Sequence, residues 1–257
     1  MSYSDFDNSI VSAGSVTYSG GADGVARLHT ALSSPLTGEG DYCREFRSNT
    51  TTVVFGADGQ IRGLWTVKPT YDGGSLFEID NTKAISVRAW VRAANNVTDM
   101  IACGVGARID LTDTNALQYT QGKGYFFHIG RYNSQGGTTN VLRFTYGKNE
   151  SATVVTSDNF NVSPLAAGTV VADTWYKLKM DVIPLLSTQD TVRLYTGTGA
   201  TGSETWTLHH EQAILSSDPD YIAPGASGEG RVGFCIGVRD TTNSVWIDRF
   251  QALVTDV

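Results

Sequence analysis

The amino-acid sequence predicts an all-β protein, a single antiparallel β-sandwich. Apolar and polar residues alternate with a period of two in one stretch after another, which is typical of strands with one buried face. Turn-forming combinations of Gly, Asp and Pro separate these stretches. Only 18% of the residues are charged and 28 of the 257 are Gly, a composition that suits turns and uncharged strand surfaces better than helices.

The alternation is clearest in three stretches, residues 84–93, 175–182 and 231–239. Weaker versions of the same pattern occur at residues 124–132, 140–146, 191–195, 204–209 and 245–254. A short helical turn is expected only at residues 210–216.

This alternation also predicts which side chains form the core. The expected core residues are Val87, Val91, Leu178, Met180, Val232, Phe234 and Ile236. Lys177, beside Leu178, is expected to face the solvent.

The chain is expected to form one domain. Strand-like stretches recur about every 8–15 residues without a longer sequence repeat, which argues against a propeller or a solenoid. No Pro-rich or Ser-rich linker divides the sequence. We therefore expect a single domain over residues 1–257, with residues 1–4 as a flexible N-terminal arm.

The C-terminal half resembles a known family. Four segments carry the resemblance, residues 175–180 (WYKLKM), 192–195 (VRLY), 230–234 (GRVGF) and 245–254 (VWIDRFQALV). In this order they are similar to strands of the concanavalin A-like (laminin-G-like) jelly roll, a domain also found in phage and virus structural proteins. Residues 5–7 (DFD) resemble its first strand, which pairs beside the last. The resemblance implies a jelly-roll sandwich over about residues 5–254.

Enzymes of this fold have motifs that can be compared residue by residue. Glucanases of the laminarinase type place three carboxylates on one strand, and here Glu78 and Asp80 match the first two. The third position is Thr82 or Lys83, so no acid would protonate the leaving oxygen. We therefore expect these residues not to be catalytic.

Jelly-roll alginate lyases offer a second comparison. Residues 125–133 are faintly similar to their Tyr-containing catalytic strand, with His128 in place of the Lys-Ala core. The Gln-x-His motif of these enzymes is missing. We interpret Tyr125, Phe127 and Ile129 as core residues and His128 as lying on the other face of the strand. No catalytic residue is predicted.

Metal binding remains a separate possibility. In many sandwiches of this family a structural calcium ion bridges the first and last strands, and Asp248 occupies the matching place, with Asp5 or Asp7 nearby. In the alternative interpretation, Asp248 accepts hydrogen bonds from a strand edge or from Arg249. The three cysteines form no Cys-x-x-Cys pair and are expected to be buried thiols.

One predicted strand face carries residues suited to binding. Arg88, Trp90 and Arg92 lie on the same face of the stretch 84–93. A Trp between two guanidinium groups can stack on a sugar ring and hydrogen-bond to its hydroxyls. Alternatively, Trp90 is packed under a loop or a second subunit, with the Arg side chains across it.

The charge, the distribution of apolar residues and the start of the sequence bear on the expected binding partners and on where the protein is made. A net charge of −7 would repel a phosphate backbone, so nucleic-acid binding is not expected. No run of eighteen apolar residues occurs, so membrane insertion is not expected either. The sequence starts without a basic and apolar leader, which predicts synthesis in a host cytoplasm.

These features favour a non-enzymatic virion structural protein. We expect a phage capsid decoration, fibre or tail component with a lectin-like fold. Its expected partners are other virion proteins or copies of itself, with surface polysaccharide as a further candidate. One alternative is a polysaccharide-active enzyme, similar to a glucanase or an alginate lyase, or a carbohydrate-binding module. A bacterial adhesin module is another alternative.

Overall fold

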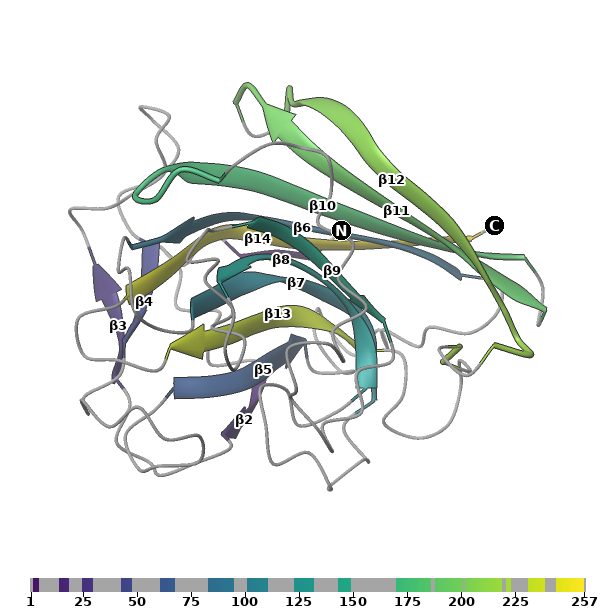
Figure 1. The fold of residues 1–257 in the computed structure, drawn as a ribbon, viewed down its shortest axis with the longest axis horizontal. Helices are drawn as coiled ribbons and strands as arrows, with labels where there is room; N and C mark the ends of the chain where they lie inside the picture. The colour runs from purple at the N-terminus through teal and green to yellow at the C-terminus, as the bar shows by residue number, and fades with distance from the viewer. Residues whose placement is uncertain are drawn as a thin grey trace, which may run out of the picture.

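The structure is a computed structural model, in which two antiparallel sheets face each other (Figure 1). It describes residues 2–4, 14–18, 25–29, 43–47, 61–67, 83–94, 101–110, 123–131, 143–148, 170–185, 188–200, 202–218, 221–222, 231–238 and 244–256. Regular structure in these ranges consists of strands alone, and every strand pair is antiparallel. The predicted all-β sandwich is confirmed.

The larger sheet has eight strands in the described residues. Their order is β12 (Thr205–Leu215), β11 (Gln189–Thr198), β10 (Trp175–Leu185), β6 (Lys83–Ala93), β14 (Ser244–Asp256), β4 (Cys43–Arg47) and β3 (Val25–His29). The remaining strand, β1 (Ser2–Ser4), pairs with residues 250–252 of β14. Residues 2–4 are therefore paired in the sheet, and the prediction of a flexible arm at residues 1–4 is wrong for them. The similar stretch 5–7 lies outside the described residues.

The smaller sheet has six strands. Their order is β2 (Gly14–Tyr18), β5 (Ile61–Val67), β13 (Arg231–Val238), β7 (Ile101–Asp110), β8 (Lys123–Arg131) and β9 (Arg143–Lys148). In Figure 1 this sheet lies beneath β6, β10 and β14 of the larger sheet.

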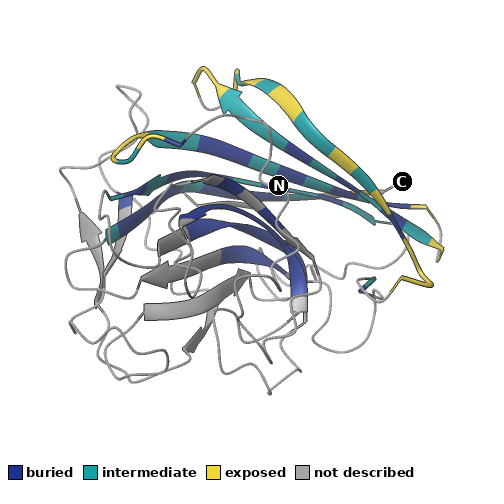
Figure 2. Cartoon of the chain, in the orientation of Figure 1, coloured by how far each residue is buried: buried dark blue, intermediate teal, exposed yellow. Residues whose placement is uncertain are grey.

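The core lies between the facing surfaces of the two sheets (Figure 2). Six of the seven predicted core residues are buried there, namely Val87, Val91, Leu178, Met180, Val232 and Phe234. The seventh residue, Ile236, lies on β13, but its side chain is not among those that the structure describes. Period-two alternation therefore identified the buried face correctly on β6, β10 and β13.

Two local predictions from the sequence are wrong. Residues 210–215 belong to strand β12 and are not a helical turn, because they pair with β11 through residue 215. A bulge lies in this pairing, where Leu194 pairs with His210 and Tyr195 with Leu208, so His209 is the extra residue. The second wrong prediction is that Lys177 faces the solvent. Its side chain points away from Leu178 as predicted, but only 1% of it is exposed.

A second bulge turns a charged residue into the core. Strand β7 has one residue more than β8 and β13 around Arg108, whose φ of 53° is in the left-handed region. The fully buried Arg108 Nη2 donates to Oδ1 of Asp190 on β11 at 2.9 Å. Tyr125 donates its hydroxyl to Oδ2 of the same carboxylate at 3.2 Å. A buried ion pair thus joins the two sheets.

Replacing a core leucine tests the strand register. Leu178→Ala should lower the free energy of unfolding by about 2–5 kcal/mol, because it empties space between the sheets. Leu185→Ala is the matched control on the same strand, since Leu185 is 59% exposed, and it should cost under about 0.5 kcal/mol. Urea unfolding measures both, and equal losses would contradict the assigned faces of β10.

The ion pair between the sheets gives a second test. Asp190→Asn keeps the shape but leaves the buried Arg108 without a countercharge, so it should cost about 3–5 kcal/mol in urea unfolding. Asp181→Asn removes a carboxylate that pairs with Lys179 on the partly exposed outer face. That control should cost at most about 1 kcal/mol, and similar losses for both variants would argue against the buried pair.

Candidate functional site

The outer face of the larger sheet carries a row of charged and aromatic side chains. Strand β6 supplies Arg88, Trp90 and Arg92 at alternate positions, which confirms that they share one face. The backbone register places Trp90 opposite Lys177 of β10 on one side and Asp248 of β14 on the other. The outer face of β6 therefore lies between charged neighbours on both sides.

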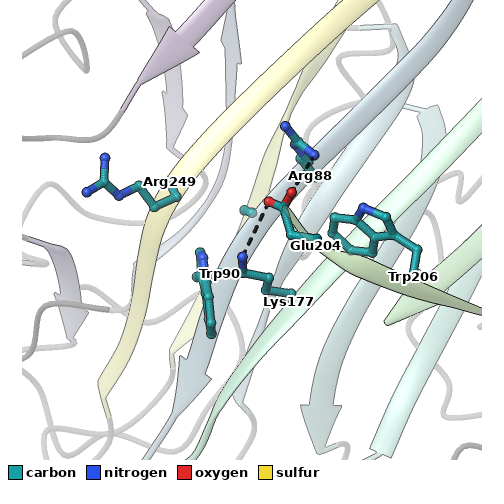
Figure 3. A pocket seen from close by; sticks show the side chains of 7 residues that line it. Arg88, Trp90, Lys177, Glu204, Trp206 and Arg249 are labelled. Carbon is teal, nitrogen blue, oxygen red and sulfur yellow. Dashed lines mark hydrogen bonds and ion pairs between the residues drawn. The ribbon is translucent and has the colours of Figure 1, made fainter. Parts of the chain in front are cut away.

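A shallow pocket lies on this face. It has about 200 Å³ of empty space, including the part open to solvent, and it is lined by Arg88, Ala89, Trp90, Lys177, Glu204, Trp206 and Arg249. Figure 3 shows Trp90 and Trp206 on opposite sides of Glu204, while Arg249 points away from the other labelled side chains. This volume is below the usual range for sites that enclose a small ligand, so the pocket suits part of a larger molecule.

Glu204 is the centre of the polar interactions in this pocket (Figure 3). Its Oε2 accepts from Nη1 of Arg88 at 3.3 Å, and its Oε1 accepts from Nζ of Lys177 at 3.3 Å. The backbone N–H of Gly202 donates to Oε2 at 2.9 Å. Burial alone would raise the pKa of Glu204, but its own backbone N–H, Arg88, Lys177 and Gly202 together lower it. Glu204 is therefore ionised at neutral pH.

The connection between β11 and β12 brings Glu204 and Trp206 onto this face. It turns through Gly199 and Gly202, whose φ values of 90° and 92° are disfavoured for residues with a Cβ. Trp206 then pairs with Gly197, and a Cβ at Gly197 would lie 2.6 Å from the indole ring. Gly197 therefore provides the space in which the Trp206 ring lies against β11.

The cations of this face lie over aromatic rings. Nζ of Lys177 is 4.2 Å from the centre of the Trp90 ring, and Nζ of Lys179 is 4.0 Å from that of Tyr195. Such contacts stabilise a cation that has lost part of its hydration. Trp90 is 6% exposed, whereas Trp206 is partly exposed. Trp206 is therefore the more accessible of the two indole rings.

Only two of the three residues predicted on this face line the pocket. Arg88 and Trp90 do, but Arg92 stacks on Trp246 at 4.8 Å and pairs with Asp173 at 3.1 Å. Sequence reasoning missed Lys177, Glu204 and Trp206. The alternation had shown the face of Lys177, but no sequence signal shows which loop residue returns to pair with it.

Asp248 lies beside the pocket and is fully buried. Its Oδ1 accepts a hydrogen bond of 2.7 Å from the backbone N–H of Arg249, as in the alternative to metal binding. Calcium takes six to eight oxygen ligands, and the described residues contain no group of three or more His, Cys, Asp or Glu that could hold a metal ion. Asp5 and Asp7 lie outside the description, so calcium at Asp248 stays a prediction.

The enzyme-like motifs fall on other parts of the chain. Glu78 and Asp80 lie outside the described residues. Tyr125, Phe127 and Ile129 are fully buried core residues, as predicted. His128 lies on the opposite face of β8 and is also buried, and this burial lowers its pKa to about 3. No helix in the described part of the chain is long and apolar enough to cross a membrane.

Comparison with known proteins supports the fold. No protein-family model matches the chain, and no curated protein matches its sequence. A similar solved structure is that of a carbohydrate esterase from Shiga toxin-encoding bacteriophage phi24B, with 13% identity and a TM-score of 0.51 over 98% of this chain and 95% of that one. At this identity the likeness concerns the fold alone.

Two further solved structures are similar. One is a lectin from Bauhinia forficata in complex with GalNAc, with 11% identity and a TM-score of 0.45 over 95% of this chain and 99% of that one. The other is the PL-14 alginate lyase from Aplysia kurodai, with 10% identity and a TM-score of 0.46 over 90% and 87%. The described strands and the phage protein's fold together confirm the expected concanavalin A-like jelly roll.

The buried His128 predicts a dependence of stability on pH. Its pKa is about 3 in the folded protein and near 6.5 in an unfolded chain, so between these values the unfolded state binds an extra proton. The free energy of unfolding should therefore fall as the pH decreases from 7 to 5.5, by at most about 1.4 kcal/mol per pH unit.

Urea unfolding at several pH values measures this slope. His128→Asn should flatten it, since Asn does not titrate. His209→Asn is the comparison, because His209 is only partly buried and its pKa is also lowered by burial. A slope unchanged by His128→Asn would contradict the assignment to this residue.

Proposed function

We propose that this protein is a non-catalytic, glycan-binding component of a virus particle, and that the pocket between Trp90 and Trp206 is its binding site. One observation carries the proposal. The pocket combines a partly exposed indole ring with a carboxylate that is already paired with two of the three cations lining it.

This combination suits a sugar ring. The apolar face of a sugar can stack on the Trp206 ring, as aromatic side chains combine apolar contact with a defined orientation. Sugar hydroxyls both donate and accept hydrogen bonds. The Glu204 carboxylate offers acceptors, and Arg88, whose side chain is 24% exposed, offers donors. The shallow shape fits one unit of a longer chain better than a fully enclosed small molecule.

The same residues argue against glycoside hydrolysis at this pocket. That reaction uses two carboxyl groups, one of them a general acid with a raised pKa. Among the residues that line the pocket, Glu204 is the one carboxylate, and its pKa is lowered. A carboxylate held in its charged form by Arg88 and Lys177 is a poor proton donor at neutral pH.

The role in a particle is supported by features outside the pocket. The chain has few charged residues, and described apolar side chains are exposed at the end of the larger sheet. Leu185 and Leu215 both lie beside Gln189 in the register and are 59% and 48% exposed. We take these two exposed leucines, which lie on either side of β11, as a candidate contact with another protein. We propose that the partner is a second copy or another virion protein.

Replacing Trp206 tests the binding site. Trp206→Ala should weaken binding of a glycan found by array screening at least about tenfold, because the stacking surface is lost. Leu208→Ala is the control, since Leu208 is an exposed apolar residue two positions along the same strand. Isothermal titration calorimetry should show unchanged affinity for the control. Equal effects of both variants, or no glycan bound at all, would contradict the proposed site.

A separate measurement tests the proposed role in a virus particle. Mass spectrometry of purified virions from a source that carries this sequence should find the protein. A monomer that binds glycans but is absent from particles would favour a carbohydrate-binding module instead. Turnover of an oligosaccharide by the purified protein would support the alternative of a polysaccharide-active enzyme.

A further inference from the structure

We propose that the pocket binds neutral glycans and that Glu204 is the residue that discriminates against acidic ones. This inference rests on the proposed function, since it names the ligand class of the same pocket. It follows from the position of one carboxylate between two cations.

Glu204 occupies the place that an acidic ligand would need. A carboxylate on a sugar is bound most effectively by Arg and Lys side chains. In this pocket Arg88 and Lys177 both point to the Glu204 carboxylate, each at 3.3 Å (Figure 3). The side chain of Glu204 is only 5% exposed, so its charge is weakly screened by water.

Three cations line the pocket, and the third, Arg249, points away from the other labelled side chains (Figure 3). Arg88 and the nearby Lys179 have further partners. Nε of Arg88 also donates to Oε1 of Gln251, and Lys179 pairs with Asp181 at 3.0 Å. A second carboxylate in the pocket would lose hydration and face the charge of Glu204. A neutral hydroxyl group meets no such repulsion, because it can donate to Glu204 and accept from Arg88.

Glu204 is also fixed in this position. Its Oε2 accepts from the backbone N–H of Gly202, and the glycine turn sets the path of the chain just before it. An acidic ligand could reach both cations only if Glu204 and this turn moved away. The turn thus makes the negative charge a permanent part of the pocket.

Matched oligosaccharides test this inference. β-1,4-linked glucose and glucuronic acid oligomers differ only at C6, and mannose and mannuronic acid oligomers form a second such pair. Wild-type protein should bind the neutral member of the preferred pair about tenfold or more tightly than the acidic member, as measured by calorimetry. Glu204→Gln should reduce this preference to less than about threefold or reverse it.

Two further variants keep the test decisive. Glu204→Gln leaves the buried Lys177 without its carboxylate, so the double variant Glu204→Gln/Lys177→Met removes both charges and should also lose the preference. Glu211→Gln removes a carboxylate from β12, the strand that follows Glu204, where Glu211 pairs with Arg193 on an exposed surface. This control should keep the full preference. Thermal unfolding shows whether each variant is folded.

The outcomes separate this inference from the proposed function. Tighter wild-type binding of the acidic member would overturn the inference while glycan binding stands. A tenfold preference that persists in folded Glu204→Gln or in the double variant would also overturn it. If wild-type protein binds neither member of either pair and no glycan on an array, the proposed function fails and the inference fails with it.

Discussion

Strand β6 is buried along its inner face and, at Trp90, on its outer face as well, and the composition of the pocket follows from this constraint. Its inner face packs Val87 and Val91 into the core, as a sandwich requires. Its outer face carries Trp90, which is covered by Lys177 from β10. A buried ammonium group needs a countercharge, because desolvation is costly without one. Glu204 supplies it, so the connection between β11 and β12 has to return over the sheet.

Two residues with left-handed backbone conformations adjust the strands to this sandwich. At Arg249, with φ of 50°, β14 has an extra residue relative to β6, and Phe250 therefore points into the core against Phe234. Without the bulge, period-two alternation would turn Phe250 outward. At Arg108 a similar bulge directs a guanidinium group inward to Asp190. Neither position is a Gly, so the sequence contains no local signal for either bulge.

The sequence predicted strands and faces well because both depend on local alternation. It failed at residues 210–216, where HEQAILS lacks alternation and pairing with β11 through residue 215 decides the structure. For Lys177 alternation gave the correct face but not its burial, which depends on a residue 27 positions away. Glu204 and Arg88 are 116 residues apart, and only the arrangement of the strands brings them together. Long-range pairing of this kind has no signature in a single sequence.

The two outer faces of the sandwich differ in chemistry, and this difference favours the larger sheet as the place of the proposed glycan binding. On the smaller sheet the described outer side chains of β8 include Phe126 and His128, both buried, and His128 is neutral because its pKa is about 3. A buried neutral imidazole offers a glycan neither charge nor access. The larger sheet instead presents Trp206 and Arg88, both partly exposed, beside an ionised Glu204. A fold does not by itself determine function, so the proposed binding depends on these side chains rather than on the sandwich.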